Sequence, residues 1–200
     1  MSNNYLPIAG TWSRDDNPND LLWWEPKSPF NLFAETNKYK QILVDDDPFI
    51  WSANVDGIDF HHHNWDWMTA GSNLAHYLKA VPLEDRNLLA HSHGGQVALY
   101  AASHLPINSL LTISTPVRQD MQNTITAARP NIKRWVHVHS DYTDTWQAYG
   151  ELFDGHFGIV RNMSRADKNI MIPGVGHSDI LYQPTAFHHW NDHSLFGYLT

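Results

Sequence analysis

The sequence predicts an α/β protein, specifically a three-layer α/β/α sandwich built on a mostly parallel sheet. Short apolar runs alternate along the chain with stretches of helical periodicity, which is the pattern of parallel strands joined by crossover helices. A chain of 200 residues, of which 42% are hydrophobic, can bury a substantial core. Because neither a repeat nor a low-complexity linker divides it, we expect residues 1–200 to form one domain.

The expected strands are short apolar or alternating runs that end at turn-forming residues such as Gly10 and Thr115-Pro116. In chain order they are Tyr5–Ala9, Gln41–Val44, Pro48–Ala53, Asn87–Ala90, Ile107–Ser114, Lys133–His139 and Asn169–Ile172.

The first expected helix begins at a cap formed by Asn64 or Asp66. Its apolar residues recur on one helical face, at Trp67, Ala70, Leu74, Tyr77 and Leu78. Later helical patterns occupy Gly94–His104, Arg118–Ala128, Thr145–Phe153 and Ile159–Ala166. The second of these ends at Arg129-Pro130, and Gly155 and Gly158 separate the last two.

Composition excludes several classes of function. The net charge of −8 disfavours a nucleic-acid surface, which is normally basic, and disfavours docking on anionic lipid. No apolar run approaches the roughly 20 residues of a membrane span, and the first residues show no signal-peptide pattern. The location stays open on these grounds, with the cytoplasm as the default. The absence of cysteine excludes disulfides and thiolate chemistry, and the oligomeric state stays open.

The segment Ala90-His91-Ser92-His93-Gly94-Gly95 carries the strongest functional signal. An apolar strand precedes it and a helical stretch follows, so Ser92 lies at the apex of a strand–turn–helix, where small neighbours let strand and helix approach closely. The segment resembles the Gly-x-Ser-x-Gly nucleophile elbow of the α/β-hydrolase family, with Ala90 at the first glycine position. The whole chain is similar to a minimal member of that family without a cap domain.

The resemblance implies a catalytic triad in the chain order serine, acid, histidine. A serine hydroxyl is a weak nucleophile, so it needs a base in contact and an acid that orients the base. The base would be His177, on a glycine-rich loop after the last expected strand. The acid would follow the penultimate strand, where we favour Asp144 over the alternative Asp141, because the family's acid usually lies several residues beyond the strand.

The family also stabilises the oxyanion with backbone N–H groups. One would come from His93, which follows the nucleophile, and the other from Thr11, with Trp12 as the alternative. The segment Gly10-Thr11-Trp12 resembles the family's oxyanion loop, although Ala9 stands where that loop often has histidine.

A small lidless chain of this kind is similar to cutinases and the smallest bacterial lipases. That similarity implies an open site for small-molecule or lipid-like acyl esters, two-step acyl transfer and no cofactor. The sequence leaves open an amidase, a hydrolase of complex cell-envelope or polymeric esters, and a binding protein that kept the fold without the chemistry.

Aromatic and histidine clusters accompany these motifs. Trp12, Trp23, Trp24 and His91 are candidates for lining the substrate pocket, with core packing an equally good interpretation for the tryptophans. We expect no metal site, because adjacent histidines in loops point in divergent directions. This expectation covers the histidine-rich stretches His61-His62-His63, His188-His189 and His193.

Overall fold

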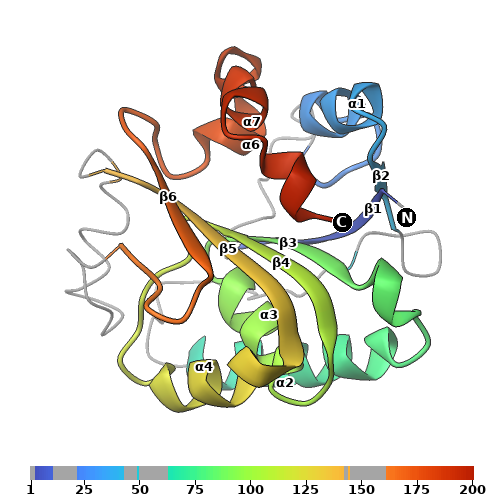
Figure 1. The fold of residues 1–200 in the computed structure, drawn as a ribbon, viewed down its shortest axis with the longest axis vertical. Helices are drawn as coiled ribbons and strands as arrows, with labels where there is room; N and C mark the ends of the chain where they lie inside the picture. The colour runs from blue at the N-terminus through green and yellow to red at the C-terminus, as the bar shows by residue number, and fades with distance from the viewer. Residues whose placement is uncertain (1–2, 11–21, 43–48, 50–62, 142–143, 145–160) are drawn as a thin grey trace.

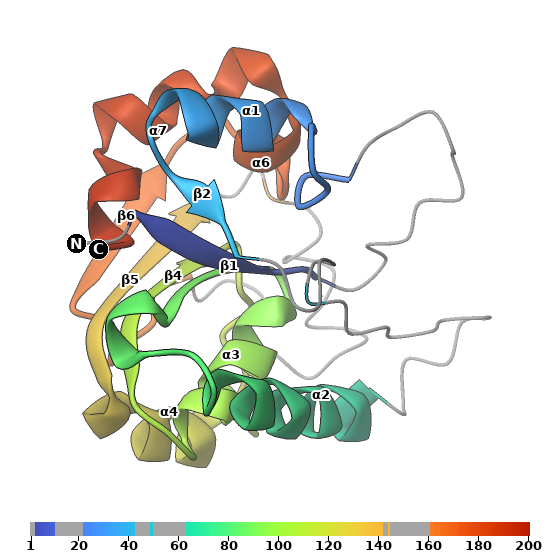
Figure 2. The ribbon, with the colours of Figure 1, turned by 90° about the vertical axis from the view of Figure 1, so that its right-hand side faces the viewer.

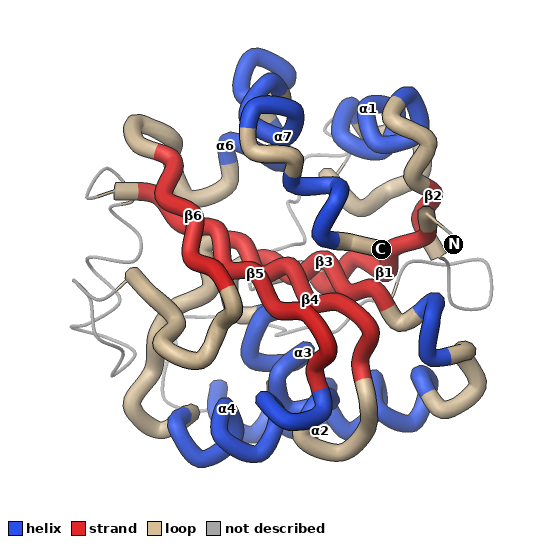
Figure 3. Tube along the Cα trace, in the orientation of Figure 1, coloured by secondary structure: helices blue, strands red, loops and turns tan. Residues whose placement is uncertain are grey.

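The computed structural model describes residues 3–10, 22–42, 49, 63–141, 144 and 161–200. Its centre is a six-stranded sheet in the order β2-β1-β3-β4-β5-β6, and every neighbouring pair is parallel (Figures 1 and 3). The strands are β1 (Asn4–Ile8), β2 (Lys40–Gln41), β3 (Asn87–His91), β4 (Ile107–Ile113), β5 (Ile132–Ser140) and β6 (Lys168–Ile172). The predicted α/β class with a mostly parallel sheet is therefore confirmed.

Helices cover both faces of the sheet and complete the three layers (Figure 2). One face carries α1 (Pro29–Thr36), α6 (Asp179–Tyr182) and α7 (His188–Asp192). The opposite face carries α2 (His63–Leu78), α3 (Gly94–Ala102) and α4 (Gln122–Ala128). Between β4 and β5 the chain forms only α4 and a short 3₁₀ turn at Arg129–Asn131, so no cap domain is inserted there.

The alternation of side chains along the strands divides the core between the two faces. Leu88 and Ala90 of β3 pack with α2 and α3. Leu89 belongs to the second core cluster, under α1 and α7, which contains the aromatic residues Trp23, Phe30 and Trp190. Because both faces are covered, every residue of β3 and β4 is buried, as expected for central strands of a parallel sheet. The site residues that follow these strands therefore stand on a rigid base.

Several expected elements differ from the structure. Helix α2 already begins at His63, so Asn64 and Asp66 lie inside it and neither is its cap. Helix α4 begins at Gln122 rather than Arg118. In the segment before it, Arg118 is buried and pairs with Asp120, with Nη2 2.8 Å from Oδ2.

The described part of Ile159–Ala166 is a loop instead of a helix. The side chain of Asn169 holds this loop, since its Oδ1 accepts the Met163 N–H at 2.8 Å and its Nδ2 donates to the Met163 carbonyl at 3.1 Å. The expected strand Pro48–Ala53, apart from Phe49, and the expected helix Thr145–Phe153 lie outside the described residues. Across the described residues, no helix has the length and apolar character needed to cross a membrane.

Candidate active site

Ser92 forms the turn between β3 and α3 in a left-handed backbone conformation, with φ at 52°. This conformation costs a non-glycine residue roughly 1–2 kcal/mol, so the surrounding structure must hold it. The Ser92 N–H donates to the Ile113 carbonyl of β4 at 2.8 Å, which fixes the turn to the neighbouring strand. The local geometry matches the predicted strand–turn–helix.

Glycines let three backbone segments meet at this turn. A Cβ on Gly94 would lie 2.3 Å from the Ala9 carbonyl oxygen, and a Cβ on Gly10 would lie 2.7 Å from the Ser92 Cβ. Both distances are shorter than real Cβ contacts, so the end of β1, the turn and the start of α3 touch only because these residues lack side chains. The loop that follows β1 therefore starts directly beside Ser92.

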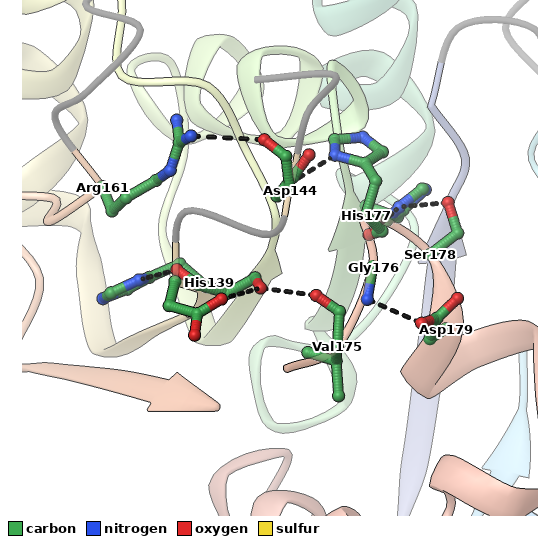
Figure 4. A network of polar contacts seen from close by, with 11 residues as sticks. His139, Asp144, Arg161, Val175, Gly176, His177, Ser178 and Asp179 are labelled. Atoms are coloured by element: carbon green, nitrogen blue, oxygen red, sulfur yellow. Dashed lines mark hydrogen bonds and ion pairs between the residues drawn. The ribbon is translucent and has the colours of Figure 1, made fainter. Parts of the chain in front are cut away.

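His177 and Asp144 are in contact although 33 residues separate them in the sequence (Figure 4). The distance between His177 Nδ1 and Asp144 Oδ2 is 2.8 Å, and the side chain of Asp144 is 0% exposed whereas that of His177 is 15% exposed. When the imidazole is neutral, Nδ1–H donates to the carboxylate and Nε2 keeps its lone pair. This arrangement is the one required of a base with its orienting acid.

Asp141, the alternative acid, has a different contact. Its Oδ2 accepts the Gly174 N–H at 3.3 Å, at the start of the loop that carries His177. The two aspartates therefore hold different parts of the same loop, Asp144 the imidazole and Asp141 the backbone.

Further polar contacts hold the His177 loop (Figure 4). Ser140 Oγ at the end of β5 donates to the Val175 carbonyl, and Asp179 Oδ2 accepts the Gly176 N–H at 2.6 Å. On the acid side, Arg161 Nη2 donates to the Asp144 carbonyl at 3.3 Å.

Sequence reasoning missed Arg161 and Asp179. Arg161 belonged to an expected helix and carried no motif. Asp179 follows a glycine turn at a helix start, which is a recognisable signal for a side chain that accepts a backbone N–H.

His91, the last residue of β3, packs against the His177 loop. Its Nε2 lies 3.2 Å from the His177 carbonyl oxygen and 3.2 Å from Ser178 Oγ, and the His91 and His177 ring centroids are 5.1 Å apart. Burial, followed by the nearby His177, lowers the pKa of His91 to about 3, so this imidazole is neutral at pH 7. A neutral Nε2–H can donate to the His177 carbonyl and hold the loop in position.

The remaining predicted site residues are the candidates for the oxyanion hole and the tryptophans proposed for the substrate pocket. His93 directly follows Ser92 at the N-cap position of α3, whereas Thr11 and Trp12 lie outside the described residues. Trp23 and Trp24 are only 1% and 3% exposed and belong to the aromatic core cluster with Phe30. Trp23 also meets the His91 ring edge to face at 6.4 Å, so the tryptophans pack behind the site in the core.

No protein-family model and no curated protein matches the chain. Among solved structures, the fold is similar to that of a protein from Thermoplasma acidophilum described as a predicted CIB-like hydrolase, with a TM-score of 0.54 and 14% sequence identity. The match covers 97% of this chain and 86% of the other. At this identity the similarity concerns the fold, and it extends over almost the whole chain.

Proposed function

We propose that the protein is a serine hydrolase that cleaves carboxylic esters through an acyl-enzyme. Ser92 would be the nucleophile, His177 the general base and Asp144 the acid that orients it. The observation that carries the proposal is the contact of 2.8 Å between His177 Nδ1 and Oδ2 of the fully buried Asp144 side chain. The left-handed elbow conformation of Ser92 supports it.

Because Nδ1 of His177 is occupied by the contact with Asp144, Nε2 is the nitrogen that can accept a proton. In the first step Ser92 Oγ attacks the ester carbonyl while His177 Nε2 accepts the hydroxyl proton. Asp144 stabilises the imidazolium that forms, and the N–H groups of His93 and Thr11 would hold the oxyanion. His177 then protonates the leaving alcohol, and a water molecule hydrolyses the acyl-enzyme by the same route.

The proposal is tested by intact-mass detection of a fluorophosphonate adduct on the wild type, Ser92→Ala and His177→Ala. The matched control is Ser114→Ala, because Ser114 also leaves a central strand with a positive φ, of 50°. One adduct is expected on the wild type and on Ser114→Ala, none on Ser92→Ala, and much slower labelling on His177→Ala. Labelling of Ser92→Ala at the wild-type rate would refute the nucleophile assignment.

A substrate panel separates the remaining possibilities. p-Nitrophenyl acetate, longer p-nitrophenyl esters and p-nitroanilides are assayed in parallel on the same variants. Turnover of the esters at rates above those of the anilides supports an esterase, and the reverse order indicates an amidase. A folded wild type that neither labels nor turns over any of them would favour a binding protein.

A further inference from the structure

We propose that α7 carries a binding site for a divalent transition metal ion of the zinc type, with His188, His189 and Asp192 as ligands. One donor atom from each residue lies within 4.8 Å of the other two. His188 Nε2 and Asp192 Oδ2 are 4.0 Å apart. Ligands of a tetrahedral zinc ion are separated by about 3.3 Å, so modest side-chain rotations would close the site.

The helix brings these ligands together. His188 and Asp192 are four residues apart and therefore lie on the same side of α7. The ring centroids of His188 and His189 are 3.9 Å apart, so these adjacent imidazoles do not diverge as they would in an extended loop. The argument from sequence against a metal site therefore does not apply to this pair.

The hydrogen bond of His188 selects the ring nitrogen that can bind a metal. His188 Nδ1 lies 2.9 Å from the Thr185 carbonyl oxygen, which can only accept a hydrogen bond, so Nδ1 carries the proton. Nε2 is then left with a lone pair on the side of Asp192. A carbonyl partner on the second ring nitrogen is the usual arrangement for metal-binding histidine.

The backbone beneath the ligands is fixed to the core. Trp190 is fully buried within α7 and its Nε1–H donates to the Ile180 carbonyl of α6 at 2.8 Å. The side chains of His188 and Asp192 are 59% and 61% exposed, so an ion can enter and keep water at its remaining positions. Two imidazoles and one carboxylate favour zinc, copper or nickel over calcium or magnesium.

The test is isothermal titration with ZnCl₂ of the wild type and of His188→Gln/His189→Gln. The controls are His76→Gln, an exposed histidine on α2, and the triple variant His61→Gln/His62→Gln/His63→Gln, which removes the other histidine run. Zinc affinity should fall by at least about 10-fold in the double variant and by a similar factor in Asp192→Asn. The two controls should bind as the wild type does.

Three results would overturn the site: equal zinc affinity of the wild type and the double variant, no saturable binding to the wild type, or equal binding of MgCl₂ and ZnCl₂. Circular dichroism checks that the exposed substitutions leave the fold intact. Because titration does not depend on ester hydrolysis, its outcome is independent of the proposed catalytic function.

Discussion

At the residue scale, Asp141 and Asp144 illustrate how two neighbouring carboxylates take different structural roles. Asp144 Oδ2 contacts the imidazole of His177, whereas Asp141 Oδ2 accepts the backbone N–H of Gly174. An acid that orients the base stabilises the imidazolium formed in the transition state. An acid that accepts a backbone N–H only holds the loop in position. The two side chains therefore form a matched pair for testing the triad.

We expect Asp144→Asn to lower kcat/KM for p-nitrophenyl esters by on the order of 10³- to 10⁴-fold, because an amide favours the wrong imidazole tautomer. Asp141→Asn should lower it by less than about 10-fold, because the amide oxygen can still accept the Gly174 N–H. Steady-state hydrolysis of the two variants makes the comparison. Equal losses would contradict the assignment of Asp144.

His91 provides a second test at this scale. His91→Phe keeps the ring but removes the nitrogen that lies 3.2 Å from the His177 carbonyl oxygen. A small displacement of a catalytic base lowers rates by up to about 100-fold, so we expect kcat to fall toward that extent with little change in KM. His104→Phe, an exposed substitution just beyond the C-terminal end of α3, is the control. Unchanged kcat in His91→Phe would show that the contact does not position the base.

At the element scale, the close approach of β1 to α3 sets the shape of the elbow. Gly94→Ala would place a Cβ 2.3 Å from the Ala9 carbonyl oxygen and 2.4 Å from that of Ile8, and backbone atoms cannot yield as a flexible side chain can. We expect it to lower the free energy of unfolding by about 3 kcal/mol and to reduce labelling of Ser92.

The matched control is Gly197→Ala, because a Cβ on Gly197 would meet no heavy atom within 4 Å. Its free energy of unfolding should stay within about 0.5 kcal/mol of the wild type. Urea denaturation measures both variants, and equal stability of the two would contradict the clash.

At the scale of the whole molecule, two buried histidines predict sensitivity to acid. Burial is the main cause that lowers the pKa of both His91 and His137 from 6.5 to about 3. Between these values the unfolded chain binds protons that the folded chain does not, so stability falls as pH decreases. At pH 5 the loss amounts to about 2 kcal/mol for each histidine, and it becomes negligible about one pH unit above 6.5.

Urea denaturation at pH 7.5, 6 and 5 measures this dependence. His137→Gln should reduce the slope of stability against pH by about one proton, whatever its effect on stability at pH 7.5. An unchanged slope would show that His137 is not responsible.

Local chemistry determined much of the fold and part of the candidate site. Alternation and apolar runs predicted β1 and the strands from β3 to β6 to within about two residues, because burial on one or both faces of a sheet leaves a direct trace in the sequence. The segment around Ser92 likewise predicted a strand–turn–helix, because a tight approach requires small residues at fixed positions.

Only the tertiary structure decided which side chains meet across long separations in the chain. It brought Asp144 rather than Asp141 to His177, placed Trp23 and Trp24 in the core, and buried Arg118 ahead of α4. Each outcome depends on loop conformation and on packing between distant elements, and a pattern confined to neighbouring residues contains no information about either.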